Sequence, residues 1–89
     1  PRLRTGKRRR VKHQTGNSER LKISISLMVR KLREEKAMSQ AALADRAGIE
    51  LEALVIMEDE HRLSLTHLLL VAEGLGIRLS ELIRMAEER

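Results

Sequence analysis

The chain of 89 residues, about 10.2 kDa, has room for one small domain with a single compact core. It contains no cysteine, which excludes disulfide bridges and thiolate metal sites, and no aromatic residue, which removes the stacking platforms used to bind single-stranded nucleic acid. The formal net charge of +5 is unevenly distributed: residues 1–23 hold nine basic residues and one acidic residue, whereas the remainder holds nine basic and twelve acidic residues.

The first predicted element is a basic arm over residues 1–22. Seven of its first twelve residues are basic, and apolar residues stand isolated until Leu21. Such a segment cannot bury enough apolar surface to offset the entropy lost on ordering, so we predict that it is flexible when free. The candidate DNA-binding residues of this arm are Arg4, Lys7, Arg8, Arg9, Arg10 and Lys12. The alternative interpretations are a basic string like those that direct nuclear import, and a merely solubilising tail.

A helical period replaces this pattern from Ser24 onward, which predicts an all-α domain over residues 23–89. In the first helix, over about 24–36, apolar residues such as Ile25 and Val29 share one face, and charged residues, Arg33 among them, take the opposite face. Short helices are expected to follow, with connections of a few residues between them.

Capping residues mark the later helices. Ser39 is expected to cap a second helix, which Gly48 ends because glycine accepts a left-handed conformation. The third helix is expected over about 50–58. Ser64 is expected to cap a fourth helix to about residue 75, and Ser80 a fifth to about residue 87.

Residues 40–57 carry the pattern of a helix-turn-helix. Small Ala44 allows two helices to approach closely, Gly48 forms the turn, and Leu54 anchors the second helix. The flanking segments "VRKLREEKAMSQAALADRAGI" and "LSLTHLLLVAEGLGIRLSELI" resemble the opening and closing segments of the lambda-repressor/Cro-like family, also called the XRE family. This resemblance, over about residues 25–84, implies a five-helix lambda-repressor-like bundle that binds DNA as a transcriptional regulator, often as a dimer.

The resemblance also implies which residues of the helix-turn-helix lie near DNA. These candidates are Ser39, Gln40, Glu50, Leu51, Glu52, Val55 and Arg62. The third helix departs from the family pattern, in which polar and basic residues occupy its DNA-facing positions. Phosphates repel carboxylates, which find a natural donor only on the cytosine amino group, whereas Leu and Val can touch a thymine methyl group.

Two interpretations of this departure stay open. In one, the basic arm supplies the phosphate affinity for duplex DNA, and the domain reads little of the sequence. In the other, the third helix binds a protein partner through Leu51, Val55 and Ile56, because these residues cannot all lie over the same core as Leu54 and Met57. RNA binding by the arm alone is a third interpretation.

Other function classes find little support in the sequence. No phosphate-binding glycine loop, nucleophile–base pair or histidine spacing typical of a metal site is recognisable, so we expect neither an enzyme nor a cofactor or metal. No apolar run approaches the roughly 20 residues of a membrane span, and the basic start lacks the apolar segment of a secretory signal. We therefore expect a cytoplasmic protein. Most aliphatic residues of the fourth and fifth helices are expected to fill the core, and the remainder, especially Leu70, Met85 and Ala86, is the candidate surface for a homodimer.

Overall fold

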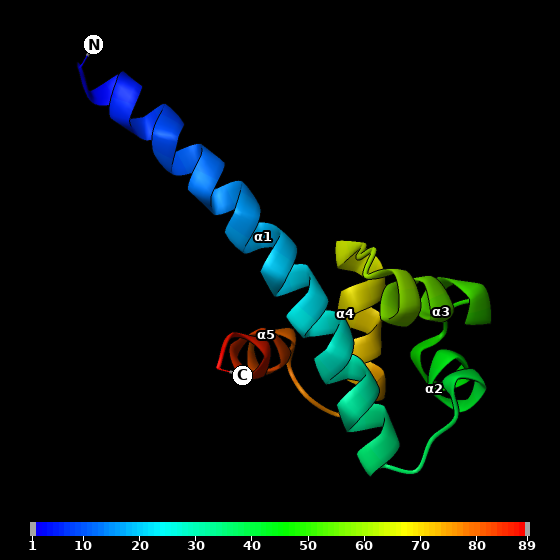
Figure 1. The fold of residues 1–89 in the computed structure, drawn as a ribbon. Helices are drawn as coiled ribbons and strands as arrows, with labels where there is room; N and C mark the ends of the chain where they lie inside the picture. Colours follow the sequence, from blue (N-terminus) through cyan, green and yellow to red (C-terminus); the bar gives the residue numbers. More distant parts are fainter. Residues whose placement is uncertain (1, 89) are drawn as a thin grey trace.

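A computed structural model describes the backbone of residues 2–88 and the side chains of residues 18–88. Over this range the chain forms five α-helices and no strand (Figure 1). They are α1 (Arg2–Glu35), α2 (Gln40–Ala47), α3 (Leu51–Glu60), α4 (Leu65–Gly74) and α5 (Leu79–Glu87). The predicted all-α, five-helix fold is confirmed. None of the helices in the described range is long and apolar enough to cross a membrane.

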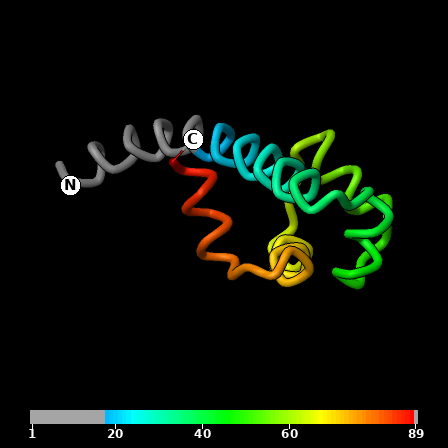
Figure 2. The backbone as a smooth tube through the Cα atoms, turned by 90° about the horizontal axis from the view of Figure 1, so that it is seen from below, coloured from blue at the N-terminus to red at the C-terminus, as the bar shows by residue number. Residues whose placement is uncertain are grey.

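The first helix starts earlier than the sequence pattern indicates. We expected a start near Ser24, but the backbone of α1 begins at Arg2, and residues 18–23, whose side chains are described, belong to it (Figure 2). Leu21 packs against the core one turn before Ile25, and the ammonium of Lys22 lies 3.3 Å from the carboxylate of Glu19, so this turn is held on both faces. The candidate DNA-binding side chains of the arm belong to residues 1–17 and lie outside the described side chains. The flexibility of the arm stays a prediction.

The second helix begins and ends at the predicted residues. The Ser39 hydroxyl accepts a hydrogen bond of 3.0 Å from the backbone N–H of Ala42. Gly48 has a φ of 75°, which an L side chain rarely adopts, and it turns the chain toward α3. These two residues fix the length of α2 and therefore the position at which α3 begins.

We predict that Ser39→Ala lowers the free energy of unfolding by about 1 kcal/mol, because an N–H at the start of α2 loses its acceptor. Chemical denaturation followed by circular dichroism measures this change. Ser80→Ala is the matched control, because Ser80 is exposed and lies within α5 rather than before it. Equal destabilisation by both substitutions would contradict the capping role of Ser39.

The last two helices confirm one predicted cap and correct the other. Ser64 caps α4, accepting a hydrogen bond of 3.4 Å from the His67 N–H. The fifth helix instead starts after Arg78, whose backbone N–H donates to the Glu81 carboxylate at 3.0 Å. The assignment of Ser80 as a cap was wrong because the helix starts two residues earlier, where the Glu81 carboxylate accepts the bond from the Arg78 N–H.

The core lies where α1, α2, α4 and α5 meet beneath the buried side of α3. Its members are Ile25, Met28, Val29, Leu43, Ala44, Ala47, Leu54, Met57, Leu68, Val71, Ala72, Leu75, Leu82 and Ala86. Ala86 is 3% exposed and belongs to the core, so the prediction that it contributes to a two-fold interface is wrong. Leu70 and Met85 are half-buried and keep part of their surface accessible. A Cβ at Gly74 would lie 3.3 Å from the Ala47 backbone, which shows how closely α2 and α4 approach.

Candidate nucleic-acid interface

Helices α2 and α3 form the predicted helix-turn-helix. The turn between them begins at Gly48, and the Ile49 N–H donates to the Ala44 carbonyl at 3.0 Å, which closes the end of α2. Ala44 at 2% exposure and Leu54 at 0% lie under the crossing, as the sequence pattern predicts. The turn and its two apolar anchors therefore set the direction in which α3 leaves the core.

The third helix has two different sides. Leu54 and Met57 are buried, whereas Leu51 is 47% exposed and Val55 and Ile56 are half-buried. The expected division of these aliphatic residues between core and surface is confirmed. Glu50 and Glu52 are also exposed, so the outward side of α3 combines aliphatic groups with carboxylates.

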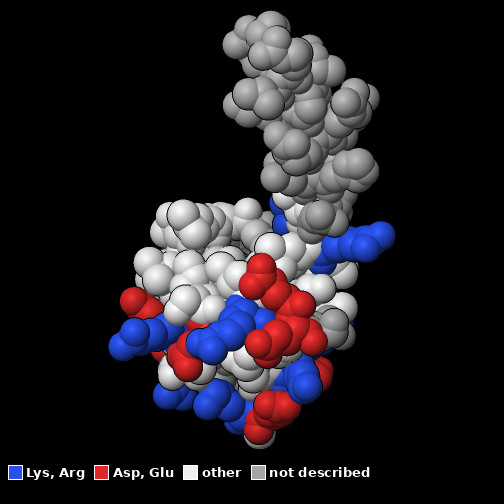
Figure 3. Space-filling model, turned by 90° about the vertical axis from the view of Figure 1, so that its left-hand side faces the viewer, with Lys and Arg blue, Asp and Glu red and all other residues white. Residues whose placement is uncertain are grey.

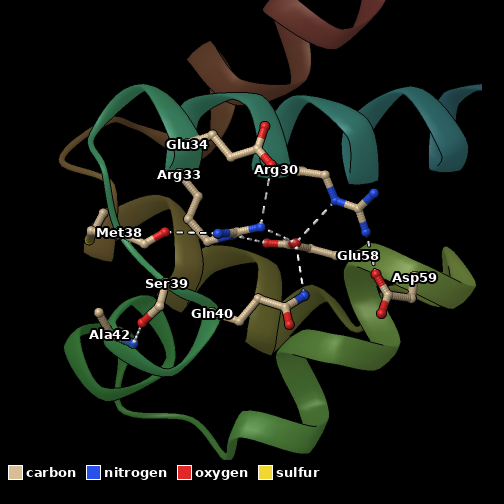
Figure 4. Close-up of polar contacts among 9 residues, drawn as sticks. All are labelled: Arg30, Arg33, Glu34, Met38, Ser39, Gln40, Ala42, Glu58 and Asp59. Atoms are coloured by element: carbon tan, nitrogen blue, oxygen red, sulfur yellow. Dashed lines mark hydrogen bonds and ion pairs between the residues drawn. The ribbon is translucent and has the colours of Figure 1, made fainter.

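A buried ion pair joins α3 to α1 (Figure 4). Arg33 binds Glu58 through two parallel hydrogen bonds, from Nε to Oε2 at 2.8 Å and from Nη2 to Oε1 at 3.0 Å. The side chain of Glu58 is 0% exposed, and that of Arg33 is 11% exposed. Arg33 also donates from Nη1 to the Met38 carbonyl at 2.8 Å, which ties the loop before α2 to the same pair. Its fork of donors suits this bidentate geometry.

Two further side chains converge on Glu58. Arg30 donates from Nε to Glu58 Oε1 at 3.4 Å and pairs through Nη2 with Asp59. Gln40 donates from Nε2 to the same Glu58 oxygen at 3.0 Å. The Glu58 carboxylate thus contacts groups from α1 and from the start of α2, and it holds α3 against both (Figure 4).

The Arg33 guanidinium is the cationic member of this pair. The hydrogen bond to Glu58 raises the pKa of the Arg33 guanidinium above its ordinary value, although desolvation by burial acts in the opposite direction. A buried carboxylate that lost its cationic partner would keep its desolvation cost, so each member of the pair depends on the other. Glu58 and Arg33 therefore act as a fixed link between α1 and α3.

This link corrects the sequence-based placement of Arg33 on the solvent face of the first helix, because Arg33 is 9% exposed. It also gives a structural role to part of the acidic run of α3. Glu58 is buried, and the neighbouring Asp59 is paired with Arg30. Opposite charges separated by 25 residues carry no periodic signal, so only the meeting of α1 and α3 reveals the pair.

The predicted contacts at the start of α2 are arranged around these bonds. Ser39 uses an oxygen lone pair to cap α2, and its hydroxyl hydrogen can still donate. Gln40 is half-buried and commits one amide hydrogen to Glu58, which leaves the second for another acceptor. The first backbone N–H groups of α2 have no partner within the helix, which makes this end a suitable anion-binding position.

Arg62, the remaining predicted site residue of the folded body (residues 18–88), follows α3. Its side chain is 76% exposed and lies 3.8 Å from the carboxylate of Glu60, a surface pair of little energetic weight. Arg62 therefore remains available to a phosphate near the end of α3. The predicted arm residues, from Arg4 to Lys12, lie outside the described side chains.

The charge of the body does not favour DNA by itself. Residues 18–88 contain thirteen acidic and ten basic residues. On the face shown in Figure 3, basic and acidic side chains alternate, so this face offers no continuous basic surface to a phosphate backbone. Among the described residues, no three side chains of the metal-ligating types come together.

Comparison with known proteins identifies the fold. The family model of the Cro/C1-type HTH DNA-binding domain matches residues 28–88. The crystal structure of the wild-type restriction-modification controller protein C.Esp1396I is similar, with 26% identity and a TM-score of 0.69; the match covers 76% of this chain and 90% of that one. A tyrosine-to-alanine mutant of the same controller protein is 28% identical, with a TM-score of 0.70 and the same coverage.

No curated protein matches the chain. The family match nevertheless extends from α1 to α5 and includes the whole helix-turn-helix, with the residues that position α3. The chain belongs to the Cro/C1-type, XRE-like family of non-enzymatic helix-turn-helix DNA-binding domains.

Proposed function

We propose that this chain is a small transcriptional regulator that binds duplex DNA, with its basic N-terminal residues supplying much of the phosphate affinity. The distribution of charge supports the second part most directly. Residues 1–17 contain seven basic residues and no acidic residue, whereas the helix-turn-helix lies in a body with more acids than bases. Counterions are released when lysine and arginine bind phosphates, and these residues are concentrated in the basic arm.

The start of α2 supports a defined orientation on the duplex. Gln40 and the first N–H groups of α2 can donate to one phosphate, and the exposed Arg62 can approach another beyond the end of α3. Phosphate contacts of this kind fix the register of a protein on DNA without reading its sequence. The similar solved structures belong to a restriction-modification controller protein, which fits a regulatory role for this chain.

The test compares duplex DNA with single-stranded RNA of equal length at about 0.1 M salt, by fluorescence anisotropy. We expect clearly tighter binding to the duplex, because the described part of the chain contains a helix-turn-helix and the sequence has no aromatic residue for base stacking. Equal affinity for the two would instead support RNA binding by the basic segment alone.

We also propose that the protein binds DNA as a homodimer. Two copies would present two α3 helices to half-sites one helical turn apart, which is the usual geometry for helix-turn-helix proteins. The half-buried Leu70 and Met85 are the candidate contacts on α4 and α5. Sedimentation equilibrium with and without duplex measures the stoichiometry.

A second candidate function is a protein-interaction module. It is favoured by the aliphatic surface of the exposed Leu51 and the half-buried Val55 and Ile56, which is bordered by the carboxylates of Glu50 and Glu52. A partner matched to this surface would present apolar side chains with lysine or arginine beside them.

The double substitution Val55→Asp and Ile56→Asp separates the two functions. If α3 docks on a protein, we expect the partner complex to be lost, because two carboxylates would be buried in an apolar contact. If α3 faces DNA, affinity should fall only by the effect of two added negative charges, which the control Glu34→Ala and Glu35→Ala substitutions calibrate with opposite sign. If the variant still forms the partner complex, the aliphatic surface of α3 is not the protein-binding site.

A further inference from the structure

We propose that the outward side of α3 selects cytosine in the major groove and binds C5-methylated cytosine more tightly than cytosine. This inference rests on the proposed binding of duplex DNA and adds the class of base that α3 reads. It is carried by three side chains, Leu51, Glu52 and Val55. All three lie on the part of the helix-turn-helix that the core leaves accessible.

The geometry of α3 brings these side chains together. Leu51 and Val55 are four residues apart and therefore lie one turn apart on one side of the helix. Glu52 is in the first turn and is three residues from Val55, so its carboxylate borders the aliphatic pair. Leu51 is 47% exposed, and the core-facing side of the helix is anchored by the fully buried Leu54.

The buried ion pair determines which carboxylates can meet a base. Glu58 is fully buried and held by Arg33, and Asp59 is paired with Arg30. Glu52, by contrast, has no ion pair or side-chain hydrogen bond within the described side chains, and it is exposed. It is therefore an exposed acceptor in the first turn of α3, next to the aliphatic pair.

Among the four bases, cytosine best suits a carboxylate in the major groove. Guanine presents only the acceptors N7 and O6, thymine presents the acceptor O4, and adenine places its N7 acceptor beside its amino group. Cytosine presents its N4 amino group as a donor without an adjacent acceptor. Repulsion between Glu52 and the phosphates weakens binding to every sequence equally, so it does not affect the choice of base.

The aliphatic pair adds the preference for the methyl group. In C5-methylated cytosine the methyl carbon projects into the major groove from the ring position next to the carbon that carries the amino group. One base then offers a donor to Glu52 and an apolar group to Leu51 or Val55. Burial of one methyl-sized group is worth about 0.8 kcal/mol, which corresponds to about fourfold tighter binding.

The experiment is a selection from two random duplex pools with the intact chain, one pool synthesised with cytosine and the other with 5-methylcytosine in its place. We expect the protein to enrich sites with a fixed cytosine in both pools. The enriched sequence should bind about fourfold more tightly when that cytosine is methylated, as measured by anisotropy.

Two variants assign the preference to named side chains. Glu52→Gln should move the selected base toward adenine, which glutamine reads through N6 and N7. Leu51→Ala with Val55→Ala should keep cytosine but lose most of the methyl preference. Glu87→Gln is the charge-matched control for the first variant, because Glu87 is exposed at the far end of α5. Circular dichroism melting verifies that each variant is folded.

The outcomes distinguish this inference from the function on which it rests. Duplex binding without enrichment of cytosine, or an enriched base that Glu52→Gln leaves unchanged, overturns the inference and leaves duplex binding intact. A preference for unmethylated cytosine also overturns it. Absence of duplex binding in both pools overturns the proposed function as well.

Discussion

Replacement of Glu58 by alanine is expected to lower the free energy of unfolding by about 3 to 5 kcal/mol. The Arg33 guanidinium would lose both of its hydrogen bonds to Glu58 while remaining largely buried, and Gln40 would lose its acceptor. This is a large part of the roughly 5 to 15 kcal/mol that stabilises a typical small domain, so we expect unfolding at a clearly lower urea concentration. Urea denaturation followed by circular dichroism measures the loss.

Two further variants show whether the unpaired Arg33 charge causes this loss of stability. Glu60→Ala is the matched control, because Glu60 lies on the same helix, is exposed and makes only a surface pair of 3.8 Å. Arg33→Met combined with Glu58→Leu removes both charges, and we expect it to recover much of the stability. A Glu58→Ala protein as stable as Glu60→Ala would contradict the role of the buried pair.

Substitution of Arg8, Arg9 and Arg10 by alanine is expected to weaken duplex binding about 100-fold at 0.15 M salt. Each phosphate contact contributes a slope of about 0.9 in the logarithm of affinity against the logarithm of salt, and three lost contacts give a factor of this size. Stability should not change, because the folded core begins with Leu21. Fluorescence anisotropy with a fixed duplex measures the affinity.

The matched control removes three positive charges from the body. Lys31→Ala, Lys36→Ala and Arg84→Ala change the net charge by the same amount at exposed positions of α1, of the turn that follows it and of α5. We expect a much smaller effect, since these residues lie outside the helix-turn-helix. Equal weakening by the two triple variants would show that net charge alone governs binding.

Local patterns allowed most of the fold to be predicted from the sequence. Ser39, Ser64 and Gly48 mark helix ends through interactions with residues close in the chain, and the structure confirms all three. The split of α3 between Leu54 and Met57 on one side and exposed residues on the other also follows from helical periodicity. Such signals need no knowledge of how the helices pack.

The errors arose where a residue has more than one local solution or a distant partner. Ser80 is a good capping residue, but Glu81 caps the backbone of Arg78 first. Arg33 lies among charged neighbours in the sequence, yet it is buried because Glu58 comes from another helix to meet it. Whether Gln40 faces a phosphate likewise depends on Glu58, which takes one of its two amide hydrogens.

The salt dependence of duplex affinity tests the proposed division of roles most directly. We would measure the affinity of the intact chain and of the protein with alanine at Arg8, Arg9 and Arg10 over a series of salt concentrations. If the N-terminal residues hold the phosphates, the slope of the logarithmic plot becomes shallower by about 2.7 in the variant. An unchanged slope would mean that the phosphate contacts come from the folded body instead.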